Sequence, residues 1–63
     1  AAKRIALNHA NLAENQVRRL RVERDREDGV WVYEVEFESG AFEYDYEIDA
    51  QTGTIRKAKK ERD

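Results

Sequence analysis

Residues 28–55 read DGVWVYEVEFESGAFEYDYEIDAQTGTI, and this stretch decides the fold. Apolar and acidic residues alternate along two runs that are separated by Ser39-Gly40. Side chains at period two point to opposite faces of a β-strand, so the pattern predicts two neighbouring strands. One face is apolar and carries Trp31, Tyr33, Val35, Phe37, Phe42, Tyr44, Tyr46 and Ile48. The other is acidic and carries Glu34, Glu36, Glu38, Glu43, Asp45, Glu47 and Asp49.

The glycines predict where the turns of this sheet lie. Asp28-Gly29 is a strong signal for a two-residue hairpin turn, because both central residues of that turn need a positive φ. Ser39-Gly40 is expected to form a second two-residue turn, and residues 50–53 (AQTG) a longer one. The expected cross-strand partners are Leu20–Phe37, Val22–Val35, Arg24–Tyr33, Phe37–Phe42, Val35–Tyr44, Tyr33–Tyr46, Trp31–Ile48 and Ile48–Ile55.

Residues 2–12 are predicted to form a helix that packs on the apolar face of the sheet. Small or apolar residues and one histidine recur there at spacings of three and four, and Asn11 can end the helix in the left-handed conformation. Residues 12–16 form a connector with room for one further helical turn, and residues 59–63 are expected to be a frayed end. The expected stripe comprises Ala2, Ile5, Ala6, His9, Ala10 and Ala13.

The predicted fold class is α+β, with one N-terminal helix on a four-stranded antiparallel meander. Its strands are expected at about 17–27, 30–38, 41–49 and 54–60, within a single domain over 1–63. Within the last strand, Lys57 and Lys59 are expected to lay their aliphatic stems against Tyr46 and Tyr44.

Composition narrows the classes of function. The chain has 63 residues, a net charge of −2 and no basic cluster interleaved with exposed aromatics, so nothing indicates nucleic-acid binding. It has no cysteine, which excludes disulfides and thiolate metal sites, and no apolar run long enough to insert in a membrane. The sequence starts at Ala1 without methionine, as expected for a processed form or a piece of a longer protein.

The acidic face has two interpretations. In the favoured one it is a solvated face balanced by cross-strand ion pairs, each worth about 0–1 kcal/mol. In the other it binds a cationic peptide or a divalent ion, although side chains on an extended sheet run parallel rather than converging. The register predicts like-charge neighbours at Glu36–Glu43 and Glu34–Asp45, and ion pairs at Arg21–Glu36, Arg19–Glu38, Lys60–Glu43 and Arg56–Glu47.

We predict no catalytic, cofactor-binding or metal-binding residues. His9 lies on the helix stripe, where a lone histidine is usually a packing or surface residue, and Ser39 is a turn residue with no base placed beside it. Glu34 and Asp45 could mimic a catalytic carboxylate pair, but the strand surface that carries them is expected to be exposed, with no cleft to raise the pKa of either carboxyl. Trp31 is either a binding anchor or, as its expected position opposite Ile48 favours, a residue at the edge of the core.

Both edges of the predicted sheet expose unpaired backbone groups. Their many lysines and arginines either discourage unwanted strand pairing or select an acidic partner strand, and the same edges could form a homodimer. The candidate partner-binding residues are Trp31, Arg19, Arg21, Arg56 and Lys60.

A set of residues spread over nearly the whole chain carries a family resemblance: Ile5-Ala6-Leu7, Ala10, Asp28-Gly29, Tyr33-Glu34-Val35, Phe37, Tyr44, Tyr46, Ile48-Asp49-Ala50, Gly53 and Ile55. In these residues and their spacing the sequence resembles the PepSY domain. The resemblance implies a helix packed on an antiparallel sheet, in a bacterial protein outside the cytoplasm whose role is to inhibit or chaperone a secreted peptidase. A non-catalytic binding module is therefore our leading hypothesis, and a structural or assembly domain of a larger envelope protein is the alternative. The family usually begins with an acidic segment led by serine or threonine, which is absent here.

Overall fold

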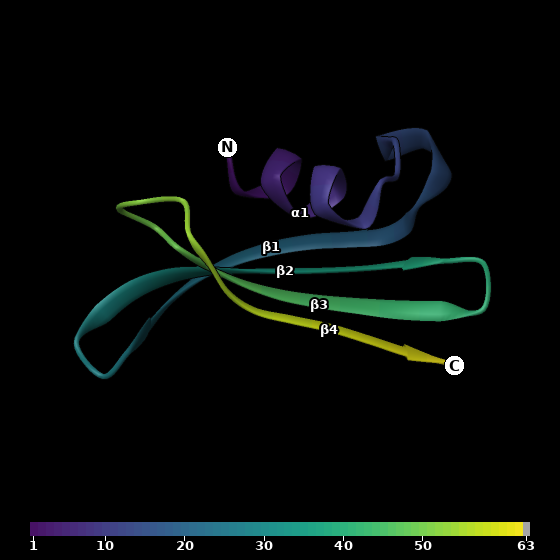
Figure 1. Ribbon diagram of the computed structural model, residues 1–63. Helices are drawn as coiled ribbons and strands as arrows, with labels where there is room; N and C mark the ends of the chain where they lie inside the picture. The colour runs from purple at the N-terminus through teal and green to yellow at the C-terminus, as the bar shows by residue number, and fades with distance from the viewer. Residues whose placement is uncertain (63) are drawn as a thin grey trace.

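The computed structural model describes residues 1–62 and confirms the predicted fold class. One helix lies along one face of an antiparallel sheet whose strands follow the chain order β1-β2-β3-β4 (Figure 1). Across these residues, the structure contains no helix with the length and apolarity needed to span a bilayer. The elements are α1 (Ala2–Ala10), a 3₁₀ turn (Glu14–Gln16), β1 (Arg18–Glu27), β2 (Val30–Ser39), β3 (Phe42–Asp49) and β4 (Ile55–Arg62).

Helix α1 ends slightly earlier than predicted, because Asn11 adopts the left-handed conformation at φ 61°. Its buried residues are Ala2, Ala6 and Leu7, and Ala6 has no exposed surface. The small side chain of Ala6 lets the helix lie close to the sheet, as the alanine-rich stripe predicted. Leu7 was not part of that stripe, yet it is buried in the same core cluster.

The main core lies between α1 and the central strands. Val35 and Phe37 of β2 and Tyr46 and Ile48 of β3 are all buried in it. The Phe37 ring stacks on that of Tyr44 with 4.9 Å between centroids. These residues come from the predicted apolar face, so the period-two pattern assigned the faces of the central strands correctly.

The first hairpin follows the prediction except at one end. Its two-residue turn is at Asp28-Gly29, whose φ angles are 51° and 79°, and Val22 lies opposite Val35. Near the start of β1 the register shifts between Arg18 and Arg21, and Arg19 adopts a φ of 55°. Arg18 rather than Arg19 therefore faces Glu38. The expected Leu20–Phe37 pair is replaced by a β-bulge, in which two residues of β1 face one of β2.

The predicted register of the second hairpin is wrong by two residues. Ser39 pairs with Phe42, so the turn is Gly40-Ala41, with Gly40 at φ 61°. A two-residue turn of type II′ takes glycine at its first central position, which favours this placement over Ser39-Gly40. Because the slide is an even number of residues, each side chain keeps its predicted face. The observed pairs are Phe37–Tyr44, Val35–Tyr46 and Tyr33–Ile48.

Strand β4 starts as predicted but continues further. Ile55 faces Ile48, and the register then shifts, leaving Arg56 as an extra residue so that Lys57 faces Glu47. Ala58 and Lys60 therefore lie opposite Tyr46 and Tyr44. The expected placement of Lys57 and Lys59 beside these tyrosines is wrong, because Lys57 faces Glu47 and Lys59 faces Asp45.

The predicted fraying of residues 59–63 is wrong for 59–62, which pair with β3 as far as Arg62 opposite Phe42. The Lys60 Nζ atom lies 4.3 Å from the centroid of the Phe42 ring, a cation–π contact that favours an ordered end. Residue 63, the last of the predicted frayed end, lies outside the described residues.

The turn before β4 is held by the carboxylate of Asp49. Its Oδ1 atom accepts hydrogen bonds from the backbone N–H groups of Gln51 at 2.8 Å and Thr52 at 2.9 Å. These bonds, led by the one from Thr52, favour the ionised form and lower the pKa of Asp49. Gly53 completes the turn at φ 78°, and a Cβ atom there would lie 3.4 Å from the Ile5 side chain of α1.

Candidate functional site

Helix α1 covers only part of the apolar side of the sheet. In Figure 1 the tip of the β1–β2 hairpin projects past the N-terminal end of the helix. The last pair between β2 and β3 is Val32–Asp49, so the hairpin beyond Val32 is a two-stranded ribbon. On the apolar side of this ribbon and next to it, Trp31 and Val22 are exposed, whereas Tyr33 is half-buried against the core. We call this the Trp31 surface and define it by Val22, Arg24, Arg26, Trp31 and Tyr33.

Trp31 is the most exposed large apolar side chain of the Trp31 surface. Its exposed fraction is 46%, and Val22 is exposed to a similar degree. The expected position of Trp31 opposite Ile48 is wrong, because the two-residue slide places Tyr33 there instead. Beyond β3, the backbone carbonyl of Trp31 accepts a hydrogen bond from the Ala50 N–H at 3.0 Å. Trp31 is thus anchored by its backbone while its indole faces solvent.

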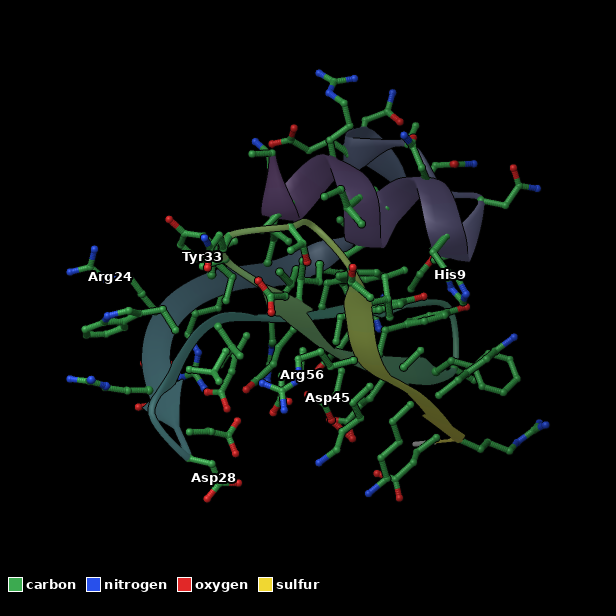
Figure 2. All side chains as sticks on the ribbon, turned by 60° about the vertical axis from the view of Figure 1, so that its left-hand side comes forward. His9, Arg24, Asp28, Tyr33, Asp45 and Arg56 are labelled. Atoms are coloured by element: carbon green, nitrogen blue, oxygen red, sulfur yellow. The ribbon has the colours of Figure 1, made fainter. Side chains whose placement is uncertain are left out.

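Two arginines of β1 flank the exposed indole. The Cζ atoms of Arg24 and Arg26 lie 4.8 Å and 5.5 Å from the ring centroid, within cation–π range. Among residues 1–62, neither guanidinium forms an ion pair with a carboxylate. Figure 2 shows Arg24 extending away from the ribbon, whereas Arg56 and Asp45 lie on the side of the sheet away from the helix.

A hollow of about 450 Å³ lies next to the indole. Residues of the β1–β2 hairpin turn and of the turn after β3 both line it, since the two turns are at the same end of the sheet (Figure 1). The hollow combines an aromatic wall with a guanidinium and an amide, which suits a partly apolar and partly charged side chain. Its lining residues are Arg24, Gly29, Val30, Trp31, Tyr33, Ala50 and Gln51.

The other predicted partner-binding residues do not gather around Trp31. Arg19 and Arg21 bind Glu38 and Glu36 on the acidic face, with N–O distances of 3.8 Å and 3.1 Å. Arg56 lies 3.8 Å from Glu47. Lys60 lies opposite Tyr44, with its ammonium over Phe42, so its predicted position opposite Glu43 is wrong; Glu61 lies there instead.

The acidic face is partly neutralised at its edges, as the favoured interpretation predicted. Between β2 and β3, the like-charge neighbours differ from the predicted ones by the same two-residue slide and are Glu34–Glu47, Glu36–Asp45 and Glu38–Glu43. Of the four ion pairs predicted on this face, those of Arg21, Arg19 and Arg56 form. Most of these arginines are exposed, so solvent screens the ion pairs and each stabilises the fold only weakly.

Three carboxylates converge at one end of the acidic face, which the sequence analysis did not expect. One oxygen from each of Glu27, Glu34 and Glu47 lies within 4.8 Å of the other two. Glu27 lies on β1 opposite Val30, on the same face of the sheet as Val32 and Glu34 of β2. Val32 has no exposed surface, although it belongs to the charged side of the alternation. The sequence signal for this small apolar region on the acidic face was the presence of valine, rather than an acidic residue, at positions 30 and 32.

The pKa values of this carboxylate cluster are shifted upward. The main cause of the raised pKa of Glu27 is a hydrogen bond between the Glu27 and Glu47 side chains, which requires a proton on one of the two carboxyls. Burial is the second cause. The expectation that nothing would raise the pKa of Glu34 is wrong: burial is the main cause of its raised pKa, and the charge of Asp25 adds to it. The Oε2 atom of Glu27 is buried without a hydrogen-bond partner. Three oxygens at this spacing suit a hard divalent cation, but a group of acidic side chains at a surface often holds none.

The raised pKa values predict how stability depends on pH. A carboxyl whose pKa is raised by folding stabilises the fold below its ordinary pKa of 4.5, and this contribution is lost as pH rises through the raised value. Glu27→Gln should therefore raise the melting temperature at pH 7, because the amide can donate to Glu47 without a charge. The gain should shrink as pH falls toward 4.5.

Thermal melts followed by circular dichroism between pH 4.5 and 7.5 measure this effect. Glu61→Gln, an exposed substitution on β4, serves as the matched control and should change the melting temperature equally little at each pH. If the difference in melting temperature between Glu27→Gln and the natural chain stays the same from pH 4.5 to 7.5, the pKa of Glu27 is not raised by folding.

Comparisons with known proteins give one family and one relative. The family model PepSY, described as "Peptidase propeptide and YPEB domain", matches residues 1–59. A protein of Streptococcus pyogenes serotype M6, named "Uncharacterized protein Spy1430", is 48% identical over 54 residues. That alignment covers 86% of this chain and 42% of the relative, so the chain spans less than half the length of the relative. No solved structure gives a significant match.

Proposed function

This chain belongs to the PepSY family, and from that premise we propose that it is a non-catalytic binding module that regulates a peptidase outside the cytoplasm. The family description supports a peptidase-propeptide type of role. Such a module works by occupying a surface of the peptidase or of its precursor, and it needs no reactive group of its own.

The observation that carries this proposal is the uncovered Trp31 surface. An exposed tryptophan flanked by arginines has the composition of the residues that contribute most to binding between proteins. The one histidine supports a structural role, since its Nδ1 atom lies 3.0 Å from the hydroxyl of Tyr46, within hydrogen-bonding distance in the helix–sheet interface. These features favour binding over catalysis.

Inhibition of secreted peptidases tests the proposed function. The purified chain is assayed against a panel of secreted thermolysin-type metallopeptidases. We expect it to slow the hydrolysis of a fluorogenic peptide by at least one of them. Mass spectrometry should find the chain intact, because a competing substrate would be cleaved. Rapid cleavage of the chain, with no slowing in any assay, would contradict a regulatory role.

A structural or assembly role is the second candidate, and the sheet edges favour it. Strand β4 pairs with β3 on one side only, so its other edge is free to pair with a second copy. Light scattering over a concentration series separates the two roles. A mass that stays at 7.4 kDa supports the binding module, whereas a stable dimer supports assembly.

A further inference from the structure

We propose that the Trp31 surface binds an acidic segment of a partner polypeptide that carries an apolar side chain between carboxylates. The inference rests on the proposed function and adds the chemistry of the partner. In the bound state, the apolar side chain packs on the Trp31 indole. Carboxylates on either side of it pair with Arg24 and Arg26.

The cations of the Trp31 surface favour a negatively charged partner. Arg24 and Arg26 form no ion pair within residues 1–62, although acidic residues make up 14 of the 63. The carboxylates of the central strands lie on the opposite face of the sheet, where other arginines bind them. A guanidinium can bind a carboxylate through two parallel hydrogen bonds, which gives both strength and orientation.

The apolar part of the Trp31 surface favours a partner with an apolar side chain. A single exposed apolar residue is normal on a protein surface. Here, however, exposed Trp31 and Val22 adjoin half-buried Tyr33 on one face, beside a hollow of about 450 Å³. That hollow has room for a large side chain such as phenylalanine or leucine. Binding would stack the partner's side chain on the indole and keep the arginines close to its carboxylates.

Two other surfaces fit an acidic segment less well. A hollow of about 500 Å³ on the acidic face includes Arg21, but that guanidinium is already bound to Glu36 and the hollow includes further carboxylates. The free edge of β4 is basic and could accept an acidic strand, yet its exposed residues include no tryptophan and no large apolar side chain. The Trp31 surface is therefore the better match to a segment that is both acidic and apolar.

The test uses a synthetic peptide, Glu-Glu-Phe-Glu-Glu, with a fluorescent label for anisotropy. Because Trp31 is the only tryptophan of the chain, its emission reports binding at this surface directly. We expect the peptide to bind and to change Trp31 emission. Its affinity should exceed that of Lys-Lys-Phe-Lys-Lys and of Glu-Glu-Gly-Glu-Glu by about tenfold or more.

The double variant Arg24→Ala/Arg26→Ala should weaken binding by about tenfold. Both side chains are exposed, so the variant should fold, which circular dichroism can verify. Lys59→Ala/Arg62→Ala removes the same charge from β4 and should stay within about twofold of the natural chain. Equal losses in the two double variants would mean that only net charge matters, and this would overturn the inference. Binding without any change in Trp31 emission would overturn it as well.

The inference and the proposed function can fail separately. If Arg24→Ala/Arg26→Ala still inhibits a peptidase as well as the natural chain does, the Trp31 surface is not the site, while the regulatory role stands. If the acidic peptide binds as expected but no peptidase is inhibited, the inference stands and the regulatory role fails.

Discussion

Replacing Phe37 with alanine is expected to remove most of the chain's free energy of unfolding at 25 °C. Phe37 is 2% exposed, and its ring lies 4.9 Å from that of Tyr44 and 6.0 Å from that of Tyr46. Removing a buried phenylalanine ring costs about 3–5 kcal/mol through lost transfer free energy and the cavity left behind. A chain of this length has a total stability of roughly 3–9 kcal/mol, so the loss consumes most of it.

Urea unfolding followed by circular dichroism measures the loss at Phe37. Phe42→Ala is the matched control, because Phe42 also lies on the apolar face but is only half-buried and contacts Lys60 and Arg62. It should cost about 1 kcal/mol. A Phe37→Ala variant as stable as the control would mean that the aromatic stack does not form the core.

Val32→Ala is expected to cost about 2 kcal/mol, from two buried methyl groups and a small cavity. This is a large effect for a residue on the charged side of the sheet. Val32 has no exposed surface and lies outside the main core cluster, on the side where Glu27, Glu34 and Glu47 converge. The predicted loss therefore tests whether the acidic face contains a second, small apolar contact.

The matched control for this substitution is Val30→Ala. Val30 lies on the same strand and face but is 37% exposed, so its loss should stay within about 0.5 kcal/mol. The free energies of unfolding in urea compare the two variants. Equal values for Val30→Ala and Val32→Ala would contradict the presence of that contact and return the acidic face to a purely solvated one.

Much of the fold followed from local sequence signals with one clear physical solution. Asp28-Gly29 fixes a two-residue turn because few other residues tolerate positive φ at both positions. Ile48 and Ile55 face each other across the AQTG turn as expected. The alternation in β2 and β3 assigned the faces correctly because a face depends only on whether a position is odd or even.

The register errors came from signals that more than one solution satisfies. Ser39-Gly40 and Gly40-Ala41 both give two-residue turns, and both keep apolar residues opposite apolar ones. The bulges near Arg19 and Arg56 lie in edge strands that are rich in charged residues. The only local signs of an extra residue are the spacings of three between Val17 and Leu20 and between Ile55 and Ala58. Alternation alone could not separate these solutions.

The candidate site depended on that register. In the predicted register Trp31 lies opposite Ile48, at the edge of the core. The observed register is shifted by two residues, so Tyr33 lies opposite Ile48 and Trp31 lies beyond the end of β3. Arg24 and Arg26 were not among the predicted partner-binding residues. Their signal was nonetheless present, because positions 24 and 26 share the face of Trp31 in the first hairpin, whose register near the turn was predicted correctly.

A map of amide chemical shifts tests the central claim most directly. The claim is that a partner binds the Trp31 surface rather than a sheet edge or the acidic face. The ¹⁵N-labelled chain is titrated with the Glu-Glu-Phe-Glu-Glu peptide, and shifts are followed for every assigned amide. We predict changes concentrated at residues 22–33 and 50–51, together with the indole N–H of Trp31. Changes concentrated along Ile55–Arg62, with the Trp31 indole unmoved, would contradict the account.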